Sequence, residues 1–566
     1  MQRSLVGSEM CIRDRYCIVI FCFLGCTCKK GEIPEGSICP EYGSSIGRHF
    51  TWDEADSVKQ KAAYFLLSQI NSYTCNSAGQ TAGETIPPAF LIRHIESKVG
   101  QYRTCSWLKG MTFETFSEYL LPYRVGDEDP FRFPGPDTLY RTKFDYLVRH
   151  YDDCRNSPYQ LGHFLLKAFS AGEAKFPGEL VPEVYKLRFL GIPATIDFLP
   201  VTERENLKSA WIYIPDDRLQ PQAPGYMQTG RIGKVYRKTF SRQPIPQSQD
   251  GEYIPSFFRN AFQKDVTDQY LHTQQVTLSV PAGMTAKHVY LAMYTDREWV
   301  PVSWSKVVQG QCCFTRLGTN TVYLPVYYQD SVSAPWAPPF ILYSNGDMQH
   351  FMPDKTLDTL VISRIRPYYD NSDRLNHYFP GSHFESADDS KFENNKKNYP
   401  IPCHPHYKWG HIRFDTLQEK RFWRHSGKEK FTFHLAELQF LDERGQVLKG
   451  RFFGPDIQEV QVVTDNNPDT YKSYKGWIGI DFGKRVKIAE IRYLLPGDGY
   501  QVRRGHRYEL FYFYDRCWKS AGVQTACREE VRFSGIPAGC LYQLLDLDND
   551  EYSTMFTVEN RKIRFH

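Results

Sequence analysis

The chain has 566 residues, of which 41% are hydrophobic and 24% charged, with a formal net charge of +4. This length is too great for a single core, so we expect several domains. The composition excludes a disordered chain, and the near-neutral charge without a long basic run excludes a nucleic-acid-binding footprint. Aromatic residues make up 15%, which favours β-rich domains because rings pack well on pleated surfaces. The 15 cysteines show no paired C-x-x-C spacing, so most are expected to be isolated thiols.

Two short segments at the start of the chain are expected to lie outside the folded protein. Residues 1–15 contain SEMCIRDR, which resembles the translated end of a sequencing adapter, and we exclude them from the fold. Residues 16–30 contain an apolar run that is too short to span a bilayer and fits the core of a signal peptide. The letters FLGC within it resemble a bacterial lipobox, in which Cys26 would carry a lipid; an ordinary cleaved signal peptide is the alternative. The segment therefore predicts an exported envelope protein, an outer-membrane lipoprotein that is periplasmic or surface-exposed.

The next part of the chain has helical patterns. Apolar residues recur at helical spacing over residues 54–70, 111–124, 137–154 and 157–171. Thr112 is expected to cap the second of these helices. We assign residues 31–130 to a helical N-terminal region.

Strand patterns dominate from residue 192 onward. Short apolar runs such as ATIDFLP, SAWIYI and GKVYRKTF follow one another, with a polar, helix-like stretch at residues 256–271. Regularly spaced turns at residues 276–365 and again at 431–566 predict two antiparallel β-sandwiches. Residues 366–430 are rich in Asn, Asp, Lys and Pro and are predicted to be a connector. The fold class is therefore α+β and multidomain, with an α+β core over residues 131–275.

Several motifs occur in an order that is typical of one family. MTFETFSEYLLPYRVGDE is followed by LRFLGIPATIDFLP, GKVYRKTF and KDVTDQYLHTQQVTLSV. In this order they resemble the transglutaminase-like lipoproteins of gut Bacteroidota, which have a papain-like fold. The stretch from GWIGIDFG to GVQTA resembles the discoidin-like (F5/8 type C, galactose-binding-fold) module of that group. The resemblance implies a transglutaminase-like core at residues 131–275, in which the apolar residues of LRFLGIPATIDFLP join a helix to the central sheet.

The resemblance also implies a Cys–His–Asp triad, and this chain departs from it. A thiolate at a helix N-terminus would attack an amide, a histidine would take the proton, and an acid would orient the imidazole. Phe176 stands at the position of the thiol, about fifteen residues before the glycine of GIP, and Ser209 stands at the position of the histidine. Asp216 or Asp217 matches the acid. Pro182 suits the first turn of a helix that begins later than the family pattern. We therefore expect a non-catalytic domain.

A displaced catalytic pair is the alternative to a non-catalytic domain. Cys154 and His163 lie nine residues apart, upstream of the expected helix. They would support a thiol-dependent transglutaminase, peptidase or glycopeptide amidase. A structural cysteine between helices and a surface histidine is the simpler interpretation.

Three stretches contain residues that can bind metals. Cys403, His404, His406 and His411 have zinc-ligand chemistry, but their loop-like segment favours a solvated loop. Residues 546–550 (DLDND) lack the glycine of a calcium loop and are expected to form a polar turn. Asp465 and Asp469, in the discoidin-like part, are candidate ligands of a structural calcium.

These features predict a non-catalytic protein that captures glycan, glycopeptide or protein at the cell envelope. No cofactor other than the structural calcium is expected, and nucleic acid is not expected as a partner.

Overall fold

The structure is a computed structural model that divides into two compact units, Met1–His350 and Phe351–His566. None of the helices in the described part of the chain is long and apolar enough to cross a membrane. The predicted lipidation site Cys26 and the whole of residues 1–45 lie outside the described residues. The structure describes residues 46, 49–50, 57–74, 86–126, 128, 131–202, 208–216, 218–224, 231–248, 251–295, 297–367, 378–401, 409–467, 470–497 and 499–566.

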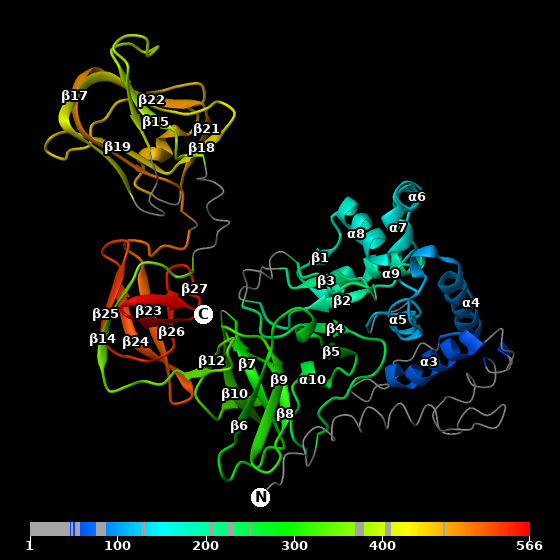
Figure 1. Ribbon diagram of the computed structural model, residues 1–566. Helices are drawn as coiled ribbons and strands as arrows, with labels where there is room; N and C mark the ends of the chain where they lie inside the picture. Colours follow the sequence, from blue (N-terminus) through cyan, green and yellow to red (C-terminus); the bar gives the residue numbers. More distant parts are fainter. Residues whose placement is uncertain are drawn as a thin grey trace, which may run out of the picture. The chain divides into compact units, whose positions relative to one another are not determined.

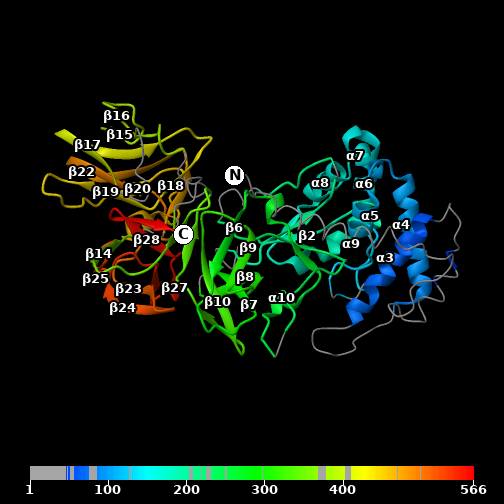
Figure 2. The same cartoon turned by 60° about the horizontal axis from the view of Figure 1, so that its bottom comes forward.

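The first half of unit 1 is helical, which confirms the prediction. Figures 1 and 2 show these helices gathered at one end of the unit, away from its C-terminal strands. They share one hydrophobic core, to which the buried Leu66, Leu91, Phe116 and Leu165 belong. The helices are α3 (Ser57–Thr74), α4 (Pro88–Thr104), α5 (Phe113–Tyr119), α6 (Thr138–His150), α7 (Asp152–Asn156) and α8 (Pro158–Phe169).

Side-chain caps begin three of the helices. Thr112 accepts a hydrogen bond from the Thr115 amide, as predicted, and Asp137 and Ser157 do the same for α6 and α8. Each cap satisfies a backbone N–H group that has no partner within its helix. Helix α4, which the sequence analysis did not identify, begins at Pro88 without a capping side chain. Its start therefore lacks the capping side chain that Thr112 provides for α5.

A five-stranded antiparallel sheet follows the helices. Its strand order is β1-β3-β2-β4-β5, and helix α9 (Val181–Phe189) precedes β2 in the chain. Residues 256–271 form only the short α10 (Ser256–Arg259), β5 and a 3-10 turn, so the helix-like pattern there was misleading. The strands are β1 (Glu173–Ala174), β2 (Thr195–Phe198), β3 (Ala210–Tyr213), β4 (Tyr236–Lys238) and β5 (Gln263–Asp265).

The two faces of this sheet differ in character. Ile196, Phe198 and Ile212 belong to the core that the helices form. Asp197 alternates with them and therefore points to the other face, because successive side chains of a strand point in opposite directions. Trp211 on β3 and Arg237 on β4 lie directly opposite Asp197 in the register. The second face thus has an acid, an indole and a guanidinium side by side.

The turn after α9 sets how the helix meets the sheet. Leu187, Ile192, Ile196 and Phe198 are buried in one core with Leu190 packed against it, as predicted for LRFLGIPATIDFLP. Gly191 has a φ of +80°, a conformation that other residues adopt only with strain. The indole N–H of Trp107 donates a hydrogen bond to the Gly191 carbonyl at 2.9 Å. The turn is therefore fixed by a glycine and by a helical side chain.

The second half of unit 1 is antiparallel and follows the predicted strand pattern. One sheet has the order β13-β12-β10-β7-β8, with β11 paired to β10, and β6 pairs with β9. Val276 and Phe314 of the β6–β9 pair share a core with Leu291 and Phe340 of the larger sheet. The strands are β6 (Gln274–Ser279), β7 (His288–Tyr294), β8 (Trp299–Lys306), β9 (Gln311–Leu317), β10 (Thr321–Gln329), β11 (Val332–Pro335), β12 (Phe340–Leu342) and β13 (Met348–His350).

Unit 2 begins with a strand that the sequence analysis placed in the preceding sandwich. Strand β14 (Leu357–Ile362) pairs with β25 (Val531–Pro537), and Leu360 shares a core with Tyr508 and Phe556. This core therefore joins the start of the unit to its end. Its other strands are β23 (Arg507–Tyr514), β24 (Cys517–Thr525), β26 (Tyr542–Asp546), β27 (Glu551–Tyr552), β28 (Phe556–Glu559) and β29 (Lys562–Phe565).

A second core of unit 2 is built from residues 379–495, which lie between the two parts of the first core in the sequence. Residues 383–426 supply three of its strands, so the prediction that residues 366–430 form a connector was wrong. The strands that were predicted to form one sandwich at residues 431–566 are divided between the two cores. These strands carry many polar residues, which made them resemble a connector in the sequence. In the structure the polar residues form ion pairs: Arg424 pairs with Glu385, and Lys420 pairs with Asp388. The strands are β15 (His383–Ala387), β16 (Lys397–Pro400), β17 (Gly410–Ser426), β18 (Thr432–Leu435), β19 (Glu437–Leu441), β20 (Arg451–Phe453), β21 (Lys472–Lys475) and β22 (Trp477–Leu494).

The turn at Gly191 gives a first prediction. Gly191→Ala should lower the free energy of unfolding by about 1–2 kcal/mol, because a Cβ atom strains the left-handed backbone there. Gly178→Ala is the matched control, since a Cβ atom at Gly178 meets no atom within 4 Å and the backbone is ordinary. Urea denaturation measures both, and equal stability of the two variants would contradict the importance of this turn.

Candidate binding site on strand β3

Phe176 and Ser209, which the family resemblance would assign to the thiol and the histidine, come close through the residues that precede Phe176. Phe176 precedes the 3-10 turn Pro177–Leu180, which leads into α9. The Ser209 amide donates to the Ala174 carbonyl at 3.1 Å, and its hydroxyl donates to the Lys175 carbonyl at 2.6 Å. The ring of Phe176 has no nucleophilic atom, and the hydroxyl of Ser209 is held by the backbone. This pair cannot perform acyl transfer.

Helix α9 begins as the sequence indicated. Pro182 lies in its first turn, where the missing N–H group costs nothing. A helix start therefore exists beside Phe176, but the residue there cannot use it to stabilise a thiolate.

The carboxylate of Asp216 is used in structural hydrogen bonds. Its carboxylate accepts hydrogen bonds from the Ser157 hydroxyl at 2.6 Å and from Arg218 at 2.8 and 2.9 Å. Burial alone would raise the pKa of Asp216, but the hydrogen bonds from Arg218 and Ser157 lower it below its usual value. The acid thus stays charged and ties the start of α8 to the end of β3. Asp217 lies outside the described residues.

The alternative pair, Cys154 and His163, has the surroundings of structural residues. Cys154 is buried in the helical core, and burial followed by the charge of Asp153 raises the pKa of its thiol. His163 is exposed, and its ring stacks on Tyr159 at 5.6 Å. A thiol with a raised pKa is a poor nucleophile at neutral pH.

A buried ion pair forms the base of the site. Arg237 donates two hydrogen bonds of 2.7 Å to Asp197, whose carboxylate also accepts one of 2.5 Å from the Tyr270 hydroxyl. Tyr270 in turn accepts a hydrogen bond of 3.2 Å from the Trp211 indole. The guanidinium carbon lies 3.3 Å from the ring centroid of Tyr213. Burial opposes the charge of Arg237, but Asp197 raises its pKa well above the usual value, so the guanidinium stays charged.

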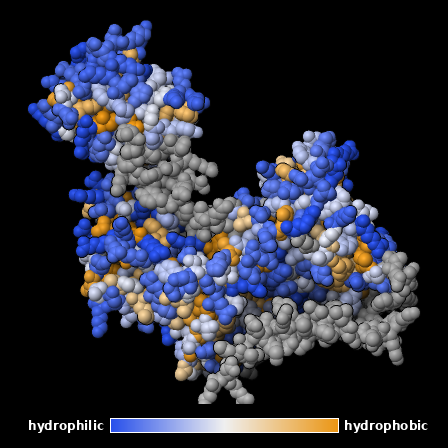
Figure 3. Space-filling view, viewed as in Figure 1, coloured by the Kyte–Doolittle hydropathy of each residue, from blue (hydrophilic) through white to orange (hydrophobic). Residues whose placement is uncertain are grey.

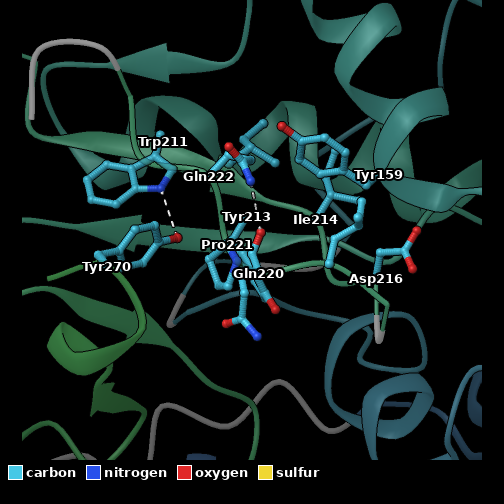
Figure 4. Close-up of a pocket in the computed structure, with 11 residues that line it drawn as sticks. Tyr159, Trp211, Tyr213, Ile214, Asp216, Gln220, Pro221, Gln222 and Tyr270 are labelled. Atoms are coloured by element: carbon cyan, nitrogen blue, oxygen red, sulfur yellow. Dashed lines mark hydrogen bonds between the residues drawn. The ribbon is translucent and has the colours of Figure 1, made fainter. Parts of the chain in front are cut away.

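A small pocket lies beside this network (Figure 4). Its volume is about 300 Å³ when space open to solvent is included. Figure 4 shows Trp211 and Tyr270 on one side and Tyr159 and Asp216 on the other, with Gln220 and Gln222 on the loop between them. Four aromatic rings and two amide side chains are the chemistry that binds sugars, because C–H faces stack on rings while hydroxyls bond to amides. The pocket residues are Tyr159, Trp211, Ile212, Tyr213, Ile214, Asp216, Leu219, Gln220, Pro221, Gln222 and Tyr270.

The sequence analysis did not identify Asp197, Arg237 and Tyr270. A signal existed, because Asp197 interrupts an apolar strand and an ionisable residue in a buried strand needs a partner. The identity of that partner depends on strand order, which the sequence alone did not specify.

A hydrogen-bonded series of Ser, His and Tyr in unit 2 has the residue types of a catalytic site. Its serine hydroxyl, however, does not donate its hydrogen to the histidine, as a nucleophilic serine must. Ser382 donates its hydroxyl hydrogen to the Phe379 carbonyl, and its oxygen lies 2.7 Å from Nε2 of His425. Nδ1 of His425 lies 2.8 Å from the Tyr474 hydroxyl. Since the serine hydrogen is already used, the imidazole donates to Ser382 and cannot activate it. Burial also lowers the pKa of His425 to about 3.

One buried carboxylate in unit 2 is poorly satisfied. Glu437, at the start of β19, is 1% exposed and makes no hydrogen bond of good geometry, although the backbone amides of Asn466 and Asn467 act on it and lower its pKa. Burial, and next the charge of Asp465, raise its pKa to about 7. Asp465 itself accepts hydrogen bonds from the Asn467 amide and the Thr470 hydroxyl. A buried carboxylate beside a second carboxylate is a donor set that fits a calcium ion.

The remaining candidate metal ligands are less well placed. Asp469, Cys403, His404 and His406 lie outside the described residues, and His411 pairs with Glu490 at 2.7 Å on the surface. The described residues therefore do not test the zinc alternative to the solvated loop that the sequence favoured.

Residues 546–550 form a polar turn. Asp546 accepts hydrogen bonds from the backbone amides of Asp548 and Asn549 and lies 3.0 Å from Nδ1 of His506. Asp548 accepts hydrogen bonds from Arg507. The three groups His506, Asp546 and Asp548 lie close together, but donors of the protein already use their carboxylates.

Comparisons with known proteins do not identify the chain. No protein-family model matches it, and no curated protein matches it. A solved structure, the crystal structure of Salmonella alpha-2-macroglobulin reacted with methylamine, aligns at 10% identity with a TM-score of 0.10. The alignment covers 64% of this chain and 27% of that one. A TM-score this low supports no conclusion about fold or function.

Glu437 gives a prediction about pH. Its folded pKa lies above the unfolded value of about 4.3, so the folded protein binds more protons between these values and loses stability as the pH rises from about 4.5 to 7. In chelator, unit 2 should lose about 2.5 kcal/mol across this range, and Glu437→Gln should remove that loss. Urea denaturation at pH 5 and pH 8 measures it, with the exposed Glu443→Gln as control. An unchanged loss in Glu437→Gln would assign the pH dependence to another group.

Proposed function

We propose that this protein is a non-catalytic binding protein of the cell envelope, with a transglutaminase-like scaffold that captures glycans or glycopeptides. The observation that carries the proposal is the pairing of Phe176 and Ser209. Ser209, just before β3, hydrogen-bonds to Ala174 and Lys175, the two residues that precede Phe176. In the family that the motifs resemble, acyl transfer would need an imidazole and a thiol at these two positions. The pocket nearby keeps the rings and amides for binding.

The ligand that best fits the pocket on β3 is a sugar. The partly exposed rings of Tyr213 and Tyr270 are held by Arg237 and Asp197, so they are preorganised, whereas Trp211 is 4% exposed and packs in the core behind them. The exposed Gln220 and Gln222 offer donors and acceptors at the edge of the pocket. A preorganised aromatic surface loses little entropy on binding.

The sequence supports the location of the protein at the envelope. The apolar run in residues 16–30 and the lipobox-like FLGC at Cys26 would direct the chain to export and attach it to a membrane by a lipid. This arrangement would present the binding domains outside the cytoplasm.

We also propose a structural calcium in the sandwich that contains β19. Glu437 and Asp465 would supply carboxylate oxygens, and the predicted ligand Asp469 belongs to the same loop in the sequence. A cation there would neutralise a carboxylate that otherwise makes no hydrogen bond of good geometry.

The pocket proposal predicts weaker sugar binding when a pocket amide is removed. Gln222→Ala should weaken binding of glycans selected from an array about fivefold, the equivalent of one hydrogen bond. Gln247→Ala is the matched control, because both glutamines are exposed and donate to the carbonyl two residues earlier at 3.3 Å. Isothermal titration calorimetry measures the difference.

A parallel assay of labelled-amine incorporation separates binding from catalysis. The wild-type protein should incorporate no amine. Incorporation that disappears in Cys154→Ala would instead establish a thiol enzyme.

The calcium proposal predicts a pH-dependent stabilisation. Calcium at 100 times its dissociation constant should raise the stability of unit 2 by about 2.7 kcal/mol. The gain should be larger at pH 8 than at pH 5, because the metal needs the ionised form of Glu437. Thermal unfolding with calcium and with chelator measures the gain, and Glu437→Gln should lose most of it. Magnesium serves as the control ion, and a calcium gain that persists undiminished in Glu437→Gln would contradict the site.

A further inference from the structure

A continuous row of exposed rings crosses the surface of α6, α7 and α8. Consecutive ring centroids lie 4.3, 6.2, 6.1, 6.2 and 5.6 Å apart. The nitrogen of Lys143 lies 5.3 Å from the ring centroid of Tyr146. We call this feature the aromatic row; in order, it consists of His150, Tyr146, Tyr151, Phe164, His163 and Tyr159.

Core packing does not explain the row. Helix α8 buries Leu161, Leu165 and Leu166 on one side, which is the spacing of a single apolar face. Phe164 points away from that face and is 38% exposed, while Tyr146 and Tyr151 are each 46% exposed. Single exposed rings are common on protein surfaces, but a connected series is typical of a binding surface.

The row leads to the pocket on β3. Tyr159 is its last ring and also lines the pocket, and Figure 4 shows it facing the pocket from the side opposite Trp211. A ligand that occupies the pocket can therefore continue onto α8 without leaving aromatic surface.

We propose that the aromatic row binds a linear oligosaccharide whose end occupies the pocket on β3. The inference rests on the proposed function and adds the shape of the ligand. The row contains two imidazoles and three tyrosine hydroxyls beside its ring faces, so a chain of sugars can both stack and form hydrogen bonds along it. Figure 3 shows mainly hydrophilic side chains around these helices, whereas the centre of a protein–protein interface is a broader apolar patch.

The test compares short and long ligands. Disaccharides and hexasaccharides of the cello-, xylo-, manno-, chito- and malto- series are titrated into the full chain by calorimetry. At least one hexasaccharide should bind about tenfold tighter than its disaccharide, which corresponds to one or two additional stacking contacts. The double variant Tyr151→Ala/Phe164→Ala should lose this tenfold gain and keep disaccharide binding. Tyr64→Ala is the matched control, because Tyr64 on α3 is 45% exposed and lies outside the row.

The outcomes separate the row from the pocket. Equal affinity for disaccharides and hexasaccharides, or no binding of any hexasaccharide, would overturn the row. Two results together would support both sites: the double variant binds disaccharides and hexasaccharides equally well, and Gln222→Ala weakens the binding of both by the same factor. Length-dependent binding that Gln222→Ala leaves unchanged would support the row and reject the pocket. The protein could instead self-associate through the row. If the double variant abolished self-association and left sugar binding unchanged, the row would be a contact between copies of the chain, and the proposal would be overturned.

Discussion

The buried ion pair between Asp197 and Arg237 is the constraint on which the N-terminal α+β domain depends. Two ionised groups leave water at a cost of several kcal/mol each, and only excellent geometry offsets it. Here Asp197 has three hydrogen bonds, two from Arg237 and one from Tyr270. The pair joins directly opposite residues of β2 and β4, so it fixes the register of the sheet. Any slip of one residue would leave both charges buried without partners.

The ion pair also determines what the pocket can do. Tyr270 connects it to the Trp211 indole, and the guanidinium stacks on Tyr213, so two pocket rings are held by charges rather than by loops. Phe176 and Ser209 carry neither a thiol nor an imidazole, and Asp216 at the edge of the pocket is already bonded to Arg218 and Ser157.

The sequence predicted the fold best where local signals were strong. The cap at Thr112, the first-turn Pro182 and the apolar residues around Gly191 all lie where the sequence placed them. The prediction failed for residues 366–430, because strands with ion-paired polar faces resemble a solvated connector. The sequence located Ser209 and Asp216 in the candidate site, but it could not locate Arg237 or the aromatic row. Those features depend on which strands and helices become neighbours, and that information is not local.

Asp197 and Glu437 are two solutions to the same physical problem. Both are acids within strands, and both are essentially inaccessible to solvent. Asp197 accepts three hydrogen bonds within its own domain, two of them from the cation that neutralises it. Glu437 makes no hydrogen bond of good geometry and faces a second carboxylate, which together with burial raises its pKa to about 7. The protein itself thus supplies the counter-charge in the N-terminal domain, whereas around β19 it leaves a carboxylate whose charge changes near neutral pH.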